Sequence, residues 1–320
     1  MKGGVVRIAT RASELALRQA RIVEAALESR GLECDIVTFK TTGDKKLDEP
    51  LSEIGAKGLF TRELEVALTK KKVDCCVHSL KDLPTELPEG LIVGAILERE
   101  DPRDVLVINP VTEAEDLASL PAGSRVGTSS LRRRAQLLAL RPDLEVAELR
   151  GNVPTRLKKV DTGKVHAAIL AAAGLIRLNA RQRIKQYLEP PEWLPAAGQG
   201  AIAIEIREDD EQMREIVLPL DHAPTSLAVR AERAFLAALE GGCQIPIGAL
   251  AVTDASNMMT LHGFVSDVRG RDSVRGSRPI DSAAPEIAGR ELAADLRTRG
   301  ATSLLMDLRS SAQLIPPQPE

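Results

Sequence analysis

The stretch VVRIATRASELALRQARIVEAAL, residues 5–27, carries the pattern that decides the fold. An apolar run over residues 5–9 predicts a β-strand, and Ser13 follows a short polar turn as an N-cap for a helix. Apolar residues then recur at helical spacing and share one face, formed by Ala16, Ala20, Val23 and Leu27. The stretch therefore predicts a strand that leads directly into an amphipathic helix.

The same unit recurs along the chain. Further strands are predicted at residues 35–41, 73–77, 91–97, 104–109, 124–127, 145–149, 167–172 and 201–206. One helix face is predicted from Phe60, Leu64, Ala67 and Leu68, and another from Leu131, Ala135 and Leu138. Strands that alternate with helices predict a parallel or mixed sheet covered on both faces.

Breaks in this alternation predict the domains. The polar segment 98–104 and the proline-rich segment 190–195 separate two α/β units, and we expect the strand at 201–206 to return to the first of them.

We expect an α/β fold with two domains, a hinge and a cleft, plus a small α+β C-terminal domain. The predicted boundaries are 1–99 with 197–218, then 100–196, then 219–320. The aperiodic residues 42–58 are interpreted as a lid, with disorder as the alternative.

Composition excludes several function classes. A net charge of −3, a pI near 6.0 and only 2% aromatic residues argue against nucleic-acid binding. Neither a signal-peptide pattern nor a membrane-spanning apolar run is found. The four cysteines lack CxxC spacing and the four histidines lack ligand spacing, so we expect a cytoplasmic protein without a metal site. We also expect a monomer.

Arginines gather where strands give way to helices. Arg7 and Arg11 flank the first such junction, Arg132 to Arg134 follow Gly127-Thr-Ser-Ser-Leu131, and Arg150 and Arg156 flank a third. Helix starts present free N–H groups, and guanidinium groups match carboxylates in bidentate fashion. Three such groups predict a small polyanion bound in a cleft, although a single arginine of this kind is more often solvated or paired.

Two further segments carry reactive groups. Ser79, Lys81 and Asp82 follow a buried strand in VHSLKDLP, residues 77–84. Asp82 can stabilise positive charge and pass a proton, or it can simply cap the turn before Pro84. Cys243 lies in the glycine turn of EGGCQIP, where it is either a thiol nucleophile or a small residue that fits the turn. Gly198-Gln-Gly200 lacks the third glycine of a dinucleotide fingerprint, so no nucleotide cofactor is expected.

Nine segments together resemble the porphobilinogen deaminase (hydroxymethylbilane synthase) family. In chain order they are RIATRAS, KGLFTRELEVAL, VHSLKDLPTELP, EREDPRD, GTSSLRRR, LRGNVPTRL, AAAGLIRL, AAGQGAIAIE and EGGCQIPIGA. The resemblance runs from Arg7 to Ala249. It implies three domains, the first two similar to type II periplasmic binding proteins.

The resemblance also implies the chemistry. Four porphobilinogen molecules would be deaminated and joined head to tail on a dipyrromethane cofactor, which is held by a thioether to Cys243, and 1-hydroxymethylbilane would be released by hydrolysis. Asp82 matches the catalytic aspartate, which assists loss of ammonia and steadies cationic pyrrole intermediates.

By the same resemblance, the residues that bind the cofactor are Ser79, Lys81, Asp82, Thr128, Ser130, Arg132, Arg133 and Arg156. Those that serve incoming substrate are Arg11, Ser13, Gln19, Arg150, Arg177 and Gln199, of which Gln199 lies at the hinge crossing. Lys57 matches a mobile loop, and Arg134 departs from the expected basic pair.

Two other classes compete with this interpretation. One is a non-enzymatic anion sensor on the same two-domain scaffold. The other is an enzyme that uses Cys243 as a nucleophile toward a small acid. The mass of the intact protein would separate them, since only the deaminase should exceed its sequence mass by two pyrrole units.

Overall fold

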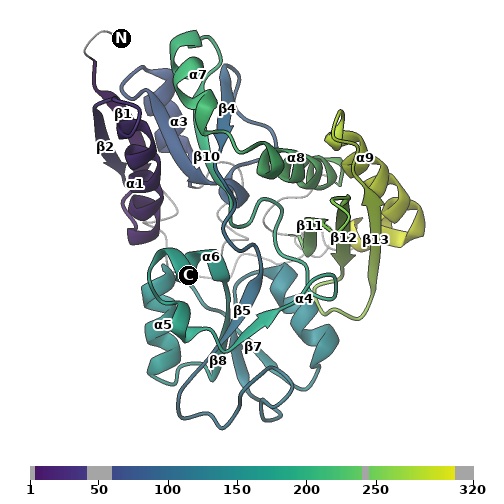
Figure 1. Ribbon diagram of the computed structural model, residues 1–320. Coiled ribbons are helices and arrows are strands. Elements are labelled where there is room, and N and C mark those ends of the chain that lie inside the picture. Colours follow the sequence, from purple (N-terminus) through teal and green to yellow (C-terminus); the bar gives the residue numbers. More distant parts are fainter. Residues whose placement is uncertain (1–3, 42–59, 240–244, 307–320) are drawn as a thin grey trace, which may run out of the picture.

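The computed structural model describes residues 4–41, 60–239 and 245–306 (Figure 1). The chain forms three lobes, and Figure 1 places the first at the top, the second at the bottom and the third at the right. The predictions that concern Lys57, the lid at residues 42–58 and Cys243 lie outside the described residues.

The first lobe is built on a five-stranded sheet in the order β2-β1-β3-β10-β4. Its strands are β1 (Val6–Arg11), β2 (Cys34–Phe39), β3 (Cys75–Ser79), β4 (Leu91–Ile96) and β10 (Ile202–Arg207). Strand β10 runs antiparallel to both of its neighbours. Its helical segments are α1 (Glu14–Glu28), α3 (Arg62–Thr69), η1 (Leu80–Asp82), α7 (Glu211–Val217) and η3 (Leu218–Leu220).

The opening stretch folds as its pattern predicts. Ser13 caps α1 by accepting a hydrogen bond from the backbone N–H of Ala16. The face predicted for the core is buried: Ala16, Ala20, Val23 and Leu27. The face predicted for α3 is correct except for Phe60, which lies in the turn before that helix begins.

The second lobe repeats this layout with a sheet in the order β7-β6-β8-β5-β9. Its strands are β5 (Asp104–Ile108), β6 (Arg125–Gly127), β7 (Glu145–Ala147), β8 (Ala167–Ala171) and β9 (Gln186–Leu188). Strand β5 is antiparallel to β8 and β9. Its helical segments are α4 (Leu131–Leu140), α5 (Val153–Asp161), α6 (Ala172–Arg177) and η2 (Arg181–Arg183).

Helix α4 departs from the predicted pattern. Ala135 is buried as expected, but Leu131 and Leu138 are only half-buried. Arg132 and Arg133 occupy the core-facing side instead, with 5% and 6% of their surface exposed. The apolar spacing predicted the wrong face because a buried carboxylate, described below, draws both guanidinium groups inward.

The third lobe packs two helices on an antiparallel three-stranded sheet. Its elements are α8 (Ala223–Ala238), β11 (Ile247–Thr253), β12 (Met259–Ser266), β13 (Ser273–Pro279), α9 (Pro285–Leu296) and η4 (Arg297–Ala301). Phe235 and Leu292 approach the sheet so closely that a Cβ at Gly263 would lie within 3 Å of both. The lobe therefore has a tightly packed core of its own.

The chain crosses between the first two lobes twice. It leaves after β4 and returns before β10, and the two crossing segments touch where the Glu100 N–H donates to the carbonyl of Gly200 at 3.2 Å. Gly200 has a φ of +90°, and a Cβ there would lie 2.3 Å from the Glu100 oxygen. A side chain at this position would force the two crossing segments apart.

The predicted fold class, two α/β domains with a smaller α+β domain, is confirmed by these sheets. The domain boundaries stay predictions. Among the described helices, none combines the length and the apolar composition needed to cross a membrane.

Candidate active site

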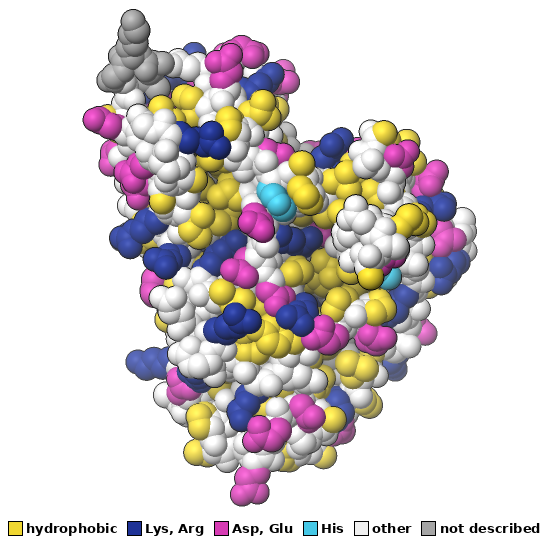
Figure 2. All heavy atoms as spheres, in the orientation of Figure 1, with side chains coloured by type: hydrophobic (Ala, Val, Ile, Leu, Met, Phe, Trp, Pro, Cys, Tyr) yellow, Lys and Arg dark blue, Asp and Glu magenta, His cyan; other side chains and the backbone are white. Residues whose placement is uncertain are grey.

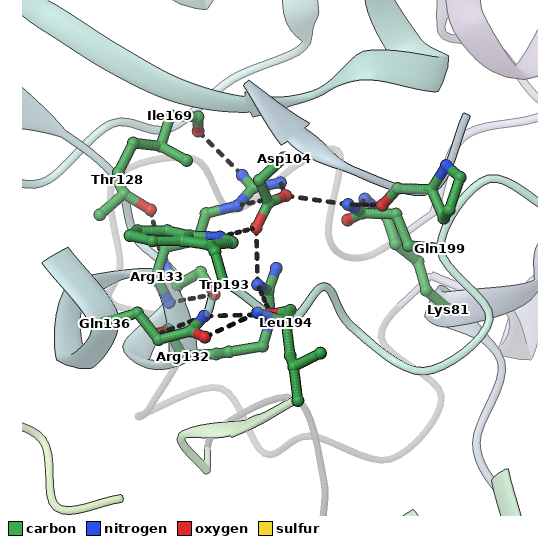
Figure 3. Close-up of polar contacts among 12 residues, drawn as sticks. Lys81, Asp104, Thr128, Arg132, Arg133, Gln136, Ile169, Trp193, Leu194 and Gln199 are labelled. Carbon is green, nitrogen blue, oxygen red and sulfur yellow. Dashed lines mark hydrogen bonds and ion pairs between the residues drawn. The ribbon is translucent and has the colours of Figure 1, made fainter. Parts of the chain in front are cut away.

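A buried carboxylate joins the polar groups of the second lobe. Asp104, the first residue of β5, is fully buried, and its two oxygens accept from Arg132 Nη1 at 2.6 Å and Arg133 Nη2 at 2.7 Å (Figure 3). Burial alone would raise the pKa of this carboxyl, but the two guanidinium groups hold it well below its usual range. Asp104 is therefore ionised, and it fixes the positions of both arginines.

The same carboxylate connects to the first lobe. Trp193 Nε1 donates to Asp104 at 2.9 Å, and Gln199 Nε2 donates to it at 2.8 Å. The other end of the Gln199 amide, Oε1, accepts from Lys81 Nζ at 3.1 Å. Figure 3 shows this continuous path from Lys81 through Gln199 to Asp104. Gln199, predicted at the hinge, thus links the two sides of the cleft.

Helix α4 presents its N-terminus and two arginines together. Ser130 caps the helix by accepting from the backbone N–H of Arg133, and the Ser130 N–H donates to Thr128 Oγ1 at 3.2 Å. Arg133 also donates to the carbonyl of Ile169, and Arg132 to that of Leu194. One carboxylate faces two guanidinium groups, so the site retains positive charge beside a helix start, an arrangement that attracts anions.

Lys81 and Asp82 lie on η1, directly after β3. Burial lowers the pKa of Lys81 to about 8, with Arg133 adding to the shift and Asp82 opposing it. Ser79, at the end of β3, exchanges hydrogen bonds with the buried amide of Gln19 at 2.8 and 3.1 Å. The strand end predicted to be reactive therefore faces the arginines of the opposite lobe.

Arg156 and Arg177 extend this positive region. The pKa of Arg156 is lowered to about 10, chiefly by burial and also by the charges of Arg133 and Arg150, while the charge of Asp82 opposes this shift. Burial likewise lowers the pKa of Arg177 to about 10. Their hydrogen bonds go to neutral carbonyls, those of Gly151 and Gly200. Desolvated cations with neutral partners favour an anionic ligand.

One atom of Arg150 also favours an anionic ligand. Its Nη1 is buried and has no hydrogen-bond partner among the described residues. A buried donor without a partner is costly, so a ligand oxygen at this atom would stabilise the protein. Figure 2 shows Lys and Arg side chains gathered along the hollow between the first and second lobes.

Two of the predicted substrate residues lie where β1 ends and α1 begins. The guanidinium carbon of Arg11 lies over the ring of Phe60, 4.3 Å from its centroid. Ser13 uses its hydroxyl as the N-cap of α1. Arg134, whose role the sequence left open, is exposed on the outer side of α4.

Sequence reasoning missed the residues that hold the site together. Asp104 is a charged residue at the head of the apolar run DVLVI, which is a signal that could have been used. Glu232 of α8 is also fully buried, and it accepts from Arg99 Nη1 at 2.6 Å, from the Gly198 N–H at 2.7 Å and from the Ala251 N–H at 2.9 Å. It ties the third lobe to both crossing segments.

Two family models match this chain, one over the first two lobes and one over the third. Residues 6–215 match the family model described as porphobilinogen deaminase, dipyromethane cofactor binding domain, and residues 226–298 match the porphobilinogen deaminase C-terminal domain. The second match reaches well beyond Ala249, where the quoted motifs end.

Relatives match nearly the whole chain. A porphobilinogen deaminase of Moorella thermoacetica is 52% identical over 96% of this chain and 97% of its own length. That of Syntrophobacter fumaroxidans is 49% identical over 96% and 99%. Among solved structures, a periplasmic substrate-binding protein from Coxiella burnetii matches at a TM-score of 0.43 and 17% identity, over 72% of this chain and 97% of that chain. On the two family models and these relatives, the chain belongs to the porphobilinogen deaminase family.

Proposed function

We propose that this chain deaminates four molecules of porphobilinogen and joins them head to tail on a covalent dipyrromethane cofactor, releasing 1-hydroxymethylbilane by hydrolysis. The observation that carries the site assignment is the convergence of desolvated cations from both lobes around Asp82. Arg156 and Lys81 both experience its charge, although they lie on different lobes.

The residues present fit a cofactor rich in carboxylates. Lys81, Arg132, Arg133 and Arg156 supply the cations, and Ser79, Thr128 and Ser130 supply hydroxyl groups beside them. Each charge-assisted hydrogen bond contributes about 1.5–3 kcal/mol. When bound, the dipyrromethane supplies the pyrrole carbon to which the first substrate is joined. We assign its thioether attachment to Cys243 on the strength of the GGCQIP segment alone.

Incoming substrate also carries acetate and propionate groups. We assign these to Arg11, Arg150 and Arg177, with Ser13, Gln19 and Gln199 as polar neighbours. The Nη1 atom of Arg150 gives the strongest support, because it has no partner in the described part of the chain and a carboxylate oxygen would satisfy it.

Asp82 is placed to act on the reacting ring. A pyrrole N–H can donate to its carboxylate, which then stabilises the positive charge that develops on the substrate as ammonia leaves. Asp82 can also exchange a proton with the substrate during the step.

We further propose that the chain works as a cytoplasmic monomer. Cys75 and Cys76 are buried thiols, as expected in a reducing compartment. Large exposed apolar side chains are spread over separate elements, such as Val66 on α3, Leu140 on α4 and Ile287 on α9.

Intact mass tests the covalent cofactor. Wild-type protein should exceed its sequence mass by two pyrrole units and give colour with acidic dimethylaminobenzaldehyde, whereas Cys243→Ser should do neither, because a hydroxyl is a far weaker nucleophile than a thiolate. Cys34→Ser is the matched control and should keep both signals. Equal colour in denatured, dialysed wild type and Cys243→Ser would place the attachment elsewhere, and wild type at its sequence mass would favour an anion sensor.

A further inference from the structure

A second cluster of ligand-type side chains lies in the first lobe, on the face of the sheet that α3 covers. Cys76 and His78 are two residues apart on β3 and therefore point to the same side of the sheet. Glu205 lies directly opposite Cys76 on the antiparallel strand β10. The Cys76 Sγ, a His78 ring nitrogen and a Glu205 carboxylate oxygen all lie within 4.8 Å of one another.

The three side chains are deeply buried. Cys76 and Glu205 have no exposed surface, and His78 is 5% exposed. His78 Nε2 lies 3.0 Å from Glu205 Oε2, and Cys76 Sγ lies 3.5 Å from the carbonyl oxygen of Leu64 on α3. The neighbouring Cys75 points the other way, into the apolar core beneath α1.

Two carboxylate oxygens in this cluster lack hydrogen-bond partners among the described residues. The Oε1 atom of Glu205 is buried without a hydrogen-bond partner among the described residues, and so is the Oε1 atom of Glu65 on α3. Glu65 is 7% exposed, and the charge of Glu205 acts on it. A buried carboxylate is normally paired or bound to a metal, and one imidazole cannot satisfy two carboxylates.

We propose that Cys76, His78 and Glu205 bind a zinc ion, with Glu65 as the fourth ligand. Thiolate, imidazole and carboxylate are the three ligand types that zinc takes in proteins, at about 2.0–2.3 Å. Tetrahedral zinc places its ligand atoms roughly 3.4 Å apart, so the cluster must adjust its side chains to bind the ion. On binding, the Cys76 thiol releases its proton to solvent, the hydrogen between His78 Nε2 and Glu205 moves to the other ring nitrogen, and the Glu205 carboxylate turns from His78 to the ion.

A surface cavity lies beside Glu65. Glu65 lines a surface cavity of about 590 Å³ between α3 and the segment after η1, together with Arg62, Thr69, Pro84 and Leu87. An ion that reaches Glu65 through this cavity meets a carboxylate before it meets the buried thiol. Such an ion would fasten α3 to β3 and β10, next to Ser79 and Lys81, without touching the reacting groups.

Cobalt substitution tests the site directly. Purified holoenzyme is treated with chelator and titrated with Co²⁺, then with Zn²⁺, and metal content is measured by mass spectrometry. We expect about one equivalent of metal, a thiolate-to-cobalt charge-transfer band that Zn²⁺ abolishes, and a higher Tm with Zn²⁺. Cys76→Ala should lose the band and the gain in Tm, whereas Cys75→Ala, the matched control from the opposite face, should keep both.

Two results would overturn the proposal. One is wild-type protein that shows neither the band nor the gain in Tm at excess metal. The other is a band that Cys75→Ala removes as fully as Cys76→Ala. If Cys76→Ala does not fold, Glu65→Gln is used in its place, and this variant should weaken zinc binding at least tenfold. Unchanged affinity together with an unchanged cobalt spectrum would exclude Glu65 as a ligand. The cobalt spectrum of the wild-type protein would then decide whether the site exists.

Discussion

Two pairs of arginines near the starts of neighbouring helices are held in opposite ways. Arg132 and Arg133 on α4 are buried against the Asp104 carboxylate. Arg150 and Arg156 flank the start of α5, where Arg156 bonds a neutral carbonyl and Arg150 Nη1 has no partner among the described residues. The first pair is fixed before any ligand arrives, while the second relies on a ligand for its counter-charge. The cleft therefore contains two kinds of cation. Arg132 and Arg133 already have a carboxylate partner, whereas Arg150 and Arg156 depend on a ligand for theirs.

Removing the central carboxylate should have the largest effect. Asp104→Asn leaves two buried guanidinium groups without an anion, and breaking a buried ion pair from one side typically costs about 3–5 kcal/mol. Denaturant unfolding measures the loss. Asp101→Asn is the matched control, because Asp101 also pairs with an arginine, Arg103, but at a more exposed position, where such pairs are worth about 0–1 kcal/mol. Similar losses in both variants would contradict the difference in burial.

The depressed pKa of Asp104 adds a pH test. Its folded pKa lies below the unfolded value, so its contribution to stability is present above the unfolded pKa of about 3.9 and is lost as pH falls below it. The gap in unfolding free energy between wild type and Asp104→Asn should therefore narrow in acid and stay constant near neutrality.

Asp82 is the carboxylate whose charge acts on Arg156 of the second pair. Replacing Asp82 should lower the rate of the reaction. Asp82→Asn keeps the size but removes the charge and the proton transfer, so kcat should fall at least about a hundredfold while the cofactor stays attached. Asp82→Glu keeps the charge and should retain part of the activity. Steady-state rates on porphobilinogen, with cofactor content checked by mass, decide the matter; an Asp82→Asn enzyme within tenfold of wild type would leave Asp82 as a turn cap.

Leucine substitutions compare the two arginine pairs directly. Arg132→Leu or Arg133→Leu should block cofactor loading and give cofactor-free protein with a lower Tm, because the mass-action stabilisation by the ligand is lost. Arg150→Leu should load the cofactor and stall at a later step, since it removes a contact worth about 1.5–3 kcal/mol to substrate. Native mass spectrometry with substrate shows which species accumulates. Normal turnover in all three variants would refute the carboxylate assignments.

The smallest effect concerns Lys81, which belongs to neither pair. Its pKa is lowered to about 8, so it loses its proton above that pH, and anion binding should weaken by up to about tenfold per pH unit. Cofactor-free Cys243→Ser protein with glutarate as the probe shows this as a falling gain in Tm between pH 7 and 9.5. Lys81→Arg keeps its charge and should flatten the profile; a flat profile in the Lys81 protein itself would contradict the prediction.

Lys81 also affects stability in the absence of ligand. Its folded pKa lies below the unfolded value of about 10.4, so the unfolded chain binds more protons between those two pH values. The unfavourable contribution of the buried charge is therefore relieved as pH rises through about 8. Ligand-free protein should gain stability over the same range in which it loses affinity for the anion.

Local pattern was enough to predict much of this architecture. Apolar spacing located α1 and its buried face, and Ser13 was recognised as the cap because that choice depends on neighbouring residues alone. Long-range pairing was not accessible in this way. The inward face of α4 was predicted wrongly because it is decided by Asp104, 28 residues earlier in the chain.

In the candidate site, too, local pattern identified some residues, and others, which depend on long-range contacts, were missed. The strand-end residues Ser79, Lys81 and Asp82 were found from their own segment, as were the arginines at helix starts. Asp104 and Glu232 were missed, since a buried acid looks like any surface acid until its partners are known. Gln199 was predicted from family resemblance, yet its bridging role depends on two contacts about 100 residues away.

The position of β10 sets an order for synthesis on the ribosome. Among the described strands β4 pairs with β10 alone, and 105 residues lie between the end of one and the start of the other. At a translation rate of about 5–20 residues per second, β4 waits roughly 5–20 s for its partner. All five strands of the second sheet emerge during that time. The nascent chain therefore completes its second lobe first, and the lobe that begins the protein closes only afterwards.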